Sequence, residues 1–320
     1  MKRVNNIYNQ IHSTENLECA EIVAQRGKAK QYGVIRYNLN RDEYFAELQK
    51  MLADGSFRTS KYTTFFIEEP KVREIFRLPF FPDRVAQHAA MNVVRPYILA
   101  MFTADTYGCI EGRGVYLGVR KLQRALRNMR ETKYCLKIDI RKFYPSIDHD
   151  ILKKQLRRKF KDHRFLSFMN EIIDSAPGLP IGNLCSQYLS NFYLTDFDHW
   201  IKEQMHVKHY FRYVDDMIFL AGDKPYLHAL LAKIRTYLKE ELNLDVKGNY
   251  QIFPVEARGI DVLGCRFYHY YTLMRKSIKK NLARAVAKHK GQQVIGGYIG
   301  WAKMCNSRHL LKKLLPNERV

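Results

Sequence analysis

Residues 211–222, FRYVDDMIFLAG, set two adjacent aspartates, Asp215 and Asp216, between two runs of apolar and aromatic residues. Such runs on either side of a polar pair predict two strands joined by a tight turn. Neighbouring carboxylates repel each other, and both stand beside residues that prefer burial. A bound divalent cation would offset this cost, whereas an ordinary polar hairpin turn is the alternative explanation.

The chain of 320 residues is strongly basic, with 54 Lys and Arg against 32 Asp and Glu and a net charge of +22. Hydrophobic residues make up 46% of it, enough for a substantial core and for two or three subdomains. This charge predicts a polyanionic partner, because binding phosphates releases condensed counterions. A ribosome-associated protein or a membrane-surface binder would share the charge, so charge alone does not identify the partner.

The six cysteines are scattered singly without a CxxC pair, which argues against a zinc ribbon and predicts reduced thiols. The first residues, MKRVNNIYNQIHSTENLE, lack the apolar core of a signal peptide. No run approaches the roughly 20 apolar residues that span a bilayer. We therefore expect a soluble, cytoplasmic protein with no membrane partner.

A second acidic strand is expected at residues 133–140, KYCLKIDI. Their alternation places Leu136, Ile138 and Ile140 on one face and Asp139 on the other. The pattern therefore predicts a strand that carries a carboxylate near its end.

From residue 133 to 250 the predicted order is strand, helix, helix, strand pair, helix, strand. This is close to a split βαβ arrangement, in which a sheet carries helices on one face. The last strand is expected at residues 243–248, NLDVKG, and a further strand at residues 259–268, GIDVLGCRFY. The strand bearing Asp139 would lie beside the hairpin, so that three carboxylates converge.

The flanking regions are basic. Residues 1–55 are predicted to be helical, and residues 61–80 to form a hairpin broken at Glu-Glu-Pro. Basic helices are expected at residues 276–290 and 298–315.

Three converging carboxylates would carry a prohibitive charge unless divalent cations neutralised it. All-oxygen ligands suit Mg²⁺, with Mn²⁺ as a possible substitute. Two such ions, roughly 3.5–4 Å apart, would activate an attacking hydroxyl and stabilise the leaving oxygen of a phosphoryl transfer.

Four stretches in the same order resemble the reverse transcriptase family over most of residues 60–275. YVDD resembles its signature box, KIDIRKFYPSIDH its first aspartate motif, LPIGNLCSQYLSNFYL its template-contacting helix and YGCIEGRG its fingers loop. The resemblance implies an α+β right-hand polymerase with fingers, a ferredoxin-like palm and a short helical thumb. The domains would be residues 1–132 for N-terminal helices and fingers, 133–270 for the palm with a fingers insertion near 160–183, and 271–320 for the basic thumb.

The resemblance also implies an RNA-directed DNA polymerase and its metal ligands. Asp139 and Asp215 would bind both ions, with Asp216 beside them, and Ile140 would offer its backbone carbonyl. Tyr144 falls where the family keeps an aromatic steric gate against the 2′-hydroxyl, the group that separates RNA from DNA precursors. A core aromatic is the alternative for Tyr144.

Other segments would bind the nucleotide. Lys71 and Arg73 match fingers positions that grip the triphosphate, and Arg77 is an equal candidate for that role. The alternative for all three is that they are ordinary basic side chains on a solvent-exposed hairpin, without a role in nucleotide binding. Lys247 is a candidate general acid for pyrophosphate. The segment around it resembles the family only loosely, so an exposed lysine without this role is the favoured expectation.

The motif at residues 181–187 departs from the pattern of most reverse transcriptases, Gln-Gly-x-x-x-Ser-Pro. Here it begins with Ile181 and Gly182 and ends with Gln187. This form resembles the enzymes of diversity-generating retroelements, which misincorporate opposite template adenines during mutagenic retrohoming. A Gln side chain at this position could hydrogen-bond and orient the incoming nucleotide, whereas Ile offers only packing. Selection of the correct nucleotide should therefore weaken. The alternative is a neutral substitution in a loop that tolerates Ile.

The implied partners are template RNA, cDNA, dNTPs and a small basic accessory protein that forms a ring, in a bacterial or phage-encoded system. The tail lacks the paired cysteines of a zinc-bearing endonuclease, and the chain lacks the Asn-Ala-x-x-His and Val-Thr-Gly motifs of retron enzymes. A phage-defence reverse transcriptase would share the palm and metal site and differ in its template source. A non-catalytic RNA-binding palm would predict lost carboxylates, and all three are present.

Overall fold

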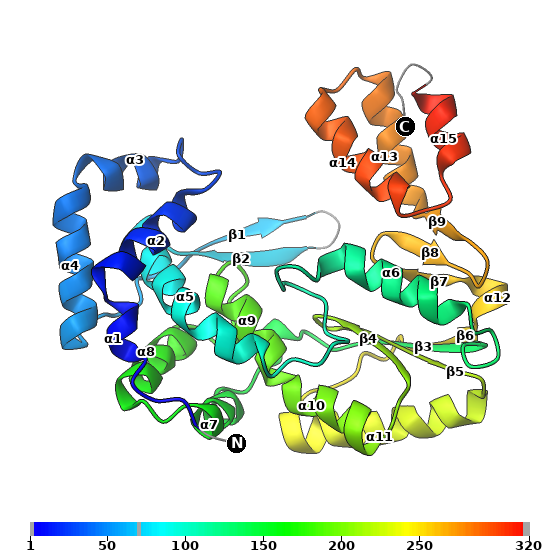
Figure 1. The fold of residues 1–320 in the computed structure, drawn as a ribbon, viewed down its shortest axis with the longest axis horizontal. Coiled ribbons are helices and arrows are strands. Elements are labelled where there is room, and N and C mark those ends of the chain that lie inside the picture. Colours follow the sequence, from blue (N-terminus) through cyan, green and yellow to red (C-terminus); the bar gives the residue numbers. More distant parts are fainter. Residues whose placement is uncertain (1–2, 69–71, 316–320) are drawn as a thin grey trace. The chain divides into compact units, whose positions relative to one another are not determined.

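The computed structural model describes residues 3–68 and 72–315, and its chain divides into two compact units (Figure 1). We call them the hairpin unit and the sheet unit. The hairpin unit comprises Met1–Thr103, Arg141–Asp198 and Tyr237–Asp245, and the sheet unit comprises Ala104–Ile140, His199–Thr236 and Val246–Val320. Two helices continue from one unit into the other, α10 (Thr195–His199) and α11 (Lys224–Leu242).

The hairpin unit is mostly helical, as expected for the N-terminal residues. Its helices are α1 (Tyr8–Ile11), α2 (Thr14–Gln25), α3 (Tyr32–Leu39), α4 (Arg41–Asp54), α5 (Val85–Leu99), α7 (His149–Lys159), α8 (His163–Asp174) and α9 (Leu184–Tyr193), with short helical turns at Phe80–Arg84 and Tyr144–Ser146.

The same unit contains the predicted hairpin. Strands β1 (Thr63–Ile67) and β2 (Arg73–Arg77) pair antiparallel, with Ile67 opposite Arg73. The hairpin is thus confirmed, although Lys71 lies outside the described residues.

A carboxylate holds the N-terminal segment against this unit. Asp162 caps α8 by accepting a hydrogen bond from the backbone N–H of Phe165 at 3.1 Å. Its other oxygen accepts from the backbone N–H groups of Ile7 and Tyr8, at 2.8 and 2.9 Å. Val4 forms a parallel bridge with Phe160 directly after α7. The first described residues are therefore fixed beside α7 and α8.

The sheet unit contains a four-stranded antiparallel sheet in the order β4-β5-β3-β6 and a three-stranded sheet in the order β7-β8-β9. The first order is that of a split βαβ, ferredoxin-like sheet. The strands are β3 (Tyr134–Asp139), β4 (His209–Tyr213), β5 (Asp216–Ala221), β6 (Gln251–Pro254), β7 (Ile260–Val262), β8 (Cys265–Phe267) and β9 (Thr272–Met274). The helices are α6 (Gly114–Leu126), α12 (Val255–Arg258), α13 (Lys276–Ala287), α14 (Gln292–Lys303) and α15 (Arg308–Leu314), with a π-type turn at Trp200–Gln204.

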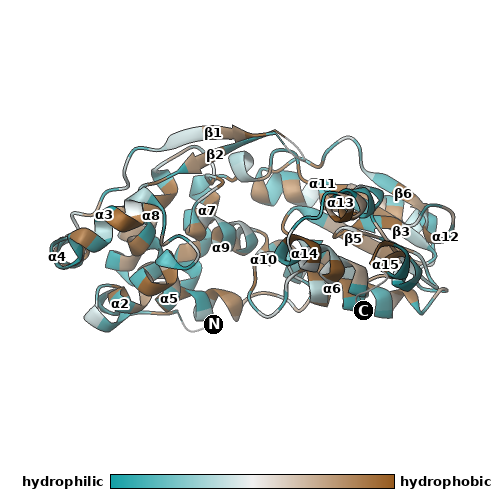
Figure 2. Cartoon of the chain, turned by 90° about the horizontal axis from the view of Figure 1, so that it is seen from above, coloured by the Kyte–Doolittle hydropathy of each residue, from teal (hydrophilic) through white to brown (hydrophobic). Residues whose placement is uncertain are grey.

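The four-stranded sheet is apolar on both faces. Cys135 and Leu220 are cross-strand partners and belong to the core that α6 enters. The next pair along the ladder, Leu136 and Phe219, points to the opposite face and is also fully buried. Hydrophobic and hydrophilic residues alternate along α6 (Figure 2), as expected for a helix with one face in a core.

Two predicted strands are corrected by the structure. Residues 243–248 form no strand, because Val246 makes only an isolated bridge with Ile140, and β6 instead begins at Gln251. Residues 259–268 form a hairpin rather than one strand. The chain turns there at Leu263 and Gly264, which both have positive φ, 48° and 73°.

The predicted basic helix at residues 276–290 is present as α13. The one predicted at residues 298–315 is instead the end of α14 and, after a turn at residues 304–307, α15; the apolar residues of the three helices share a small core. Cys305 follows α14, and its Sγ lies 3.1 Å from the Sγ of Cys265 on β8. Among the described residues, no helix combines the length and apolar character that crossing a bilayer would require.

Candidate active site

Three carboxylates meet at one end of the central strands of the sheet unit. Asp139 is the last residue of β3 and is the cross-strand partner of Asp216, the first residue of β5. Asp215 precedes it in the two-residue turn from β4 to β5. The register of the sheet therefore brings together the three aspartates that the sequence predicted, and Ile140 follows directly on β3.

The turn that carries Asp215 has an unusual backbone. Val214 has a φ of 59°, which a β-branched residue rarely adopts but which a two-residue hairpin turn requires at its first position. The buried Arg212 side chain donates a hydrogen bond to the backbone carbonyl of Val214 at 3.1 Å. Gly108 lies so close that an added Cβ would stand 2.6 Å from Cγ2 of Val214. Arg212 and Gly108 thus fix the turn from two sides.

The surroundings of Asp215 favour its protonated form. Burial raises the pKa of Asp215 from 3.8 to about 6, and the neighbouring Asp139 and Asp216 carboxylates add to the rise. One oxygen of Asp139, Oδ1, is buried without a hydrogen-bond partner. A buried, unsatisfied carboxylate oxygen beside further carboxylates is an environment that a hard cation would stabilise.

Lys247 already occupies part of this cluster. Its Nζ lies 2.5 Å from Oδ2 of Asp139, and its backbone N–H donates to the Asp139 carbonyl at 2.9 Å. The expectation of an exposed lysine is wrong, because the side chain is half-buried and ion-paired. Within residues 3–68 and 72–315, no set of three or more His, Cys, Asp or Glu side chains is arranged as a ready metal cage. The donors therefore suit a divalent cation that completes its shell from water and substrate.

Tyr144 lies in the hairpin unit, in the short turn Tyr144–Ser146. Its side chain is half-buried, and its hydroxyl accepts a hydrogen bond from Oγ of Ser190 at 3.2 Å. Its carbonyl accepts from the backbone N–H of Leu179 at 2.8 Å, and Gly178 approaches too closely for any Cβ. The ring is therefore held by contacts with α9 and with the loop before it.

The loop at residues 181–182 joins strand β2. The carbonyl of Ile181 accepts a hydrogen bond from the backbone N–H of Phe76 at 2.8 Å. Gly182 has a φ of 132°, and an added Cβ would stand 2.1 Å from the Phe76 carbonyl oxygen. Only glycine fits there. Gln187 is exposed on the first turns of α9, and Arg73 is exposed on β2.

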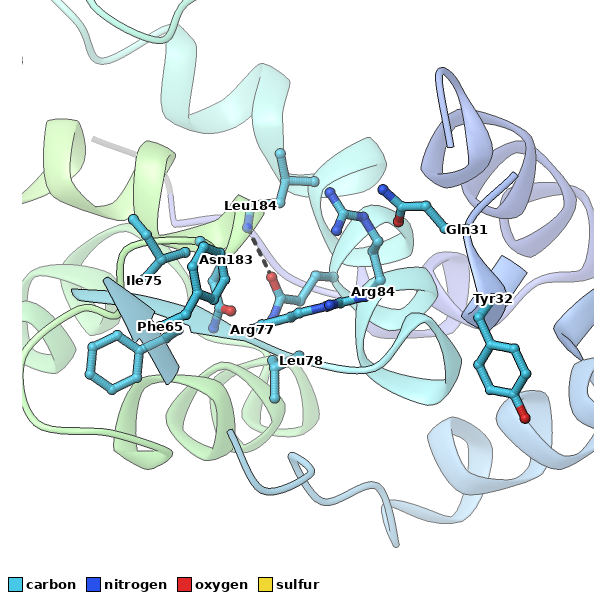
Figure 3. A pocket seen from close by; sticks show the side chains of 12 residues that line it. Gln31, Tyr32, Phe65, Ile75, Arg77, Leu78, Arg84, Asn183 and Leu184 are labelled. Atoms are coloured by element: carbon cyan, nitrogen blue, oxygen red, sulfur yellow. Dashed lines mark hydrogen bonds between the residues drawn. The ribbon is translucent and has the colours of Figure 1, made fainter. Parts of the chain in front are cut away.

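A pocket of about 440 Å³ opens beside this loop, and Figure 3 shows its lining. Arg77 and Arg84 both line it, and neither has a carboxylate partner among the described residues. The Nε of Arg84 is buried without an acceptor, and burial and the nearby Arg77 lower its pKa. The dashed line in Figure 3 marks the bond from the backbone N–H of Leu184 to Gln87. Two uncompensated guanidinium groups make this pocket suitable for an anion.

Four residues of these sites were missed or underrated from the sequence: Lys247, Arg212, Gly108 and Arg84. Only Gly108 had a local signal, since it belongs to the glycine-punctuated stretch YGCIEGRG. The neighbouring residues of the other three give no such signal, and Lys247 reaches Asp139 from a segment more than 100 residues away.

Comparison with known proteins gives a family match and several relatives. A family model described as "Reverse transcriptase (RNA-dependent DNA polymerase)" matches residues 69–267. Protein YkfC of Escherichia coli K12 is 26% identical over 140 residues, which cover 40% of this chain and 37% of that protein. Retron Ec73 reverse transcriptase of Escherichia coli is 24% identical over 198 residues, which cover 54% of this chain and 62% of that protein. The chain thus spans less than two thirds of either relative.

Solved telomerases have a similar fold. Apo telomerase from Candida tropicalis matches with a TM-score of 0.53 at 12% identity, over 81% of this chain and 55% of that chain. Telomerase from Candida albicans, solved with a TWJ fragment of telomeric RNA, matches with a TM-score of 0.52 at 10% identity, over 87% and 62%. These likenesses confirm the expected α+β polymerase fold.

Proposed function

Because the chain belongs to the reverse transcriptase (RNA-dependent DNA polymerase) family, we propose that it is an RNA-directed DNA polymerase that copies a template RNA into cDNA from dNTPs. The observation that carries the proposal is the convergence of Asp139, Asp215 and Asp216 at one end of the sheet. The net charge of +22 supports a nucleic-acid partner.

Members of the family use divalent metal ions. We propose two Mg²⁺ ions here, with Mn²⁺ as a substitute, held by the three aspartates and the carbonyl of Ile140. Bound cations would neutralise the carboxylates and polarise the oxygens of the reacting phosphate. Asp139 and Asp215 would orient the substrate through these ions, and Lys247, whose Nζ lies beside Oδ2 of Asp139, would donate a proton to leaving pyrophosphate.

The hairpin unit would select the nucleotide. Tyr144, half-buried and held through its hydroxyl, is proposed as the ring that excludes a 2′-hydroxyl. Ile181, Gly182 and Gln187 would form the nucleotide-binding motif. Among the basic fingers residues, Arg77 has the stronger support as the phosphate ligand because it lines the anion-suited pocket, whereas Arg73 does not.

The test of the polymerase proposal is primer extension on an RNA template by purified Asp215→Asn. The variant should lose cDNA synthesis while retaining RNA binding, because the fold does not require the charge. A matched control is Asp42→Asn, which removes an exposed carboxylate on α4. Near-wild-type extension by Asp215→Asn would refute the metal assignment.

We further propose that the enzyme is error-prone at template adenines, as part of a diversity-generating retroelement with a small basic ring-forming accessory protein. The support is the departure at Ile181 and Gln187 from the common motif. Ile181→Gln should lower misincorporation opposite adenine more than opposite other bases. One hydrogen bond is worth about 0.5–1.5 kcal/mol, so the change should be at most about tenfold. Sequencing of cDNA products measures it, with Ile35→Gln on exposed α3 as the control.

A second candidate is a retron-type or phage-defence reverse transcriptase, which the likeness to Retron Ec73 reverse transcriptase favours. The two candidates differ in fidelity. An error spectrum without excess at adenine in the wild type, unchanged in Ile181→Gln, would favour the second candidate. A non-catalytic RNA-binding palm would require the wild type to extend no primer at all.

A further inference from the structure

A row of cations lies on the exposed side of α7, in the hairpin unit. Lys154, Arg157, Arg158 and Lys161 are exposed, from the middle of α7 to just beyond its end, and each of them has another of the four three or four positions away. Helical spacing places Lys154, Arg157 and Arg158 on one side of α7, whereas Lys161 follows the extended residue Phe160 that ends the helix.

A fifth cation reaches this row from the start of the chain. Arg3 donates a hydrogen bond to the carbonyl of Phe160 at 3.1 Å, and the backbone of Val4 is bridged to Phe160. The two residues are 157 positions apart in sequence. Arg3 and α7 together line an open hollow of about 790 Å³. We call this surface, formed by Arg3, Lys154, Arg157, Arg158 and Lys161, the α7 basic surface.

The charge of this surface is largely uncompensated. Arg158 is paired with Asp196, but within the described residues no ion pair forms at Lys154 or Arg157. Of the described residues that line the hollow, Asp150 is the one with a carboxylate. Like charges three or four residues apart destabilise a helix. The helix dipole explains cations in the last turn, such as Arg157 and Arg158, but neither Lys154 in the middle of α7 nor Arg3.

The surroundings restrict the kind of anion. The exposed large hydrophobic side chains of the described residues lie elsewhere, and none falls between residues 149 and 164. A membrane-binding helix would need an apolar face, and a protein interface would need an aromatic or apolar centre. Single-stranded RNA is usually held by aromatic rings that stack on its bases. A double-helical RNA, which presents phosphates and 2′-hydroxyls and hides its bases, needs none of these.

We propose that the α7 basic surface binds the backbone of a double-helical RNA segment, separate from the strand being copied. This rests on the proposed function, since it assumes a protein that handles RNA. The surface would retain a structured part of the template RNA and leave the three aspartates to act on another part.

The test uses a closed RNA dumbbell, a duplex without a free end that primer extension would require. The variant is Lys154→Gln/Arg157→Gln, and the matched control is Lys233→Gln/Arg235→Gln on exposed positions of α11, with the same residue types and charge change. Each lost phosphate contact removes a slope of about 0.7–0.9 in log affinity against log salt. The loss of dumbbell affinity between 50 and 200 mM salt should therefore shrink by about sevenfold to twelvefold in the variant and little in the control. The conservative Lys154→Arg should bind like the wild type.

Two further readouts separate this inference from the proposed function. Extension of oligo(dT) on poly(rA) should be unchanged in Lys154→Gln/Arg157→Gln, because the catalytic aspartates are intact. If the wild type extends the primer but the variant binds the dumbbell like the wild type or the control, the inference is overturned and the polymerase proposal stands. An equal loss of affinity for single-stranded RNA would overturn the assignment to duplex RNA. Failure of the wild type to extend any primer would instead refute the proposed function.

Discussion

Replacing Asp215 by Asn should stabilise the metal-free protein while it abolishes cDNA synthesis. Burial and the neighbouring carboxylates raise the pKa of Asp215 from 3.8 to about 6. Because the folded pKa is raised, the protonated carboxyl stabilises the fold at low pH, and this contribution is lost as the pH rises through about 6. The gap between 3.8 and about 6 corresponds to about 3 kcal/mol, at about 1.36 kcal/mol per pKa unit. At pH 7.5 the uncharged Asn should recover up to about 3 kcal/mol of unfolding free energy.

The assay is urea unfolding in EDTA at pH 4.5 and pH 7.5, followed by tryptophan fluorescence. Both tryptophans, Trp200 and Trp301, belong to the sheet unit, so the signal reports on the unit that carries the carboxylates. The advantage of Asp215→Asn should be clear at pH 7.5 and small at pH 4.5. Glu47→Gln, an exposed change on α4, should stay within about 0.5 kcal/mol of the wild type. Equal stability of Asp215→Asn and wild type at both pH values would refute the electrostatic argument.

Three other changes test the surroundings of the site. Tyr144→Ala should incorporate ribonucleotides in primer extension, because it removes the ring that would exclude the 2′-hydroxyl, whereas Tyr144→Phe keeps the ring and should not. If Tyr144→Ala keeps the wild-type preference for dNTPs, another residue excludes ribonucleotides. Gly108→Ala should lower the free energy of unfolding by about 1–3 kcal/mol, because the added Cβ would stand 2.6 Å from Cγ2 of Val214. In the control Gly300→Ala the added Cβ meets nothing within 4 Å, so this variant should be as stable as the wild type. Lys247→Ala should tighten Mn²⁺ binding to the substrate-free protein about fivefold, because it removes an ion pair with Asp139 that is worth about 1 kcal/mol. Titration calorimetry measures the affinity, and equal affinity of variant and wild type would show that Lys247 does not compete with the cation.

The pairing of β3 with β5 could be predicted because both strands have strong local patterns. Leu136 and Ile138 alternate with polar residues, and the aspartate pair is bounded by apolar runs on both sides. Since side chains alternate along a strand, the register that buries these residues also sets Asp139 opposite Asp216. The three site carboxylates follow from the same local patterns as the sheet.

The residues around the carboxylates could not be predicted in this way. Residues 243–248 alternate like a strand, but the backbone N–H of Leu244 bonds to Leu238 in α11 and only Val246 pairs with the sheet. Lys247 reaches Asp139 from this irregular segment. Arg212 reads as a solvent-facing strand residue, yet its guanidinium is fully buried and bonds to the carbonyl of Val214. No repeating pattern encodes such single contacts.

The way residues 181 and 182 join strand β2 has a consequence for how this family member can evolve. The carbonyl of Ile181, and not its side chain, makes the bond to Phe76, so many side chains can be tried at this position while the bond persists. Its neighbour has no such freedom, because every residue larger than Gly182 would collide with the Phe76 carbonyl. A position that tolerates substitution, 181, is thus followed directly by one that does not, 182. The side chain at position 181 can therefore change by single substitutions, without compensating changes elsewhere in the fold.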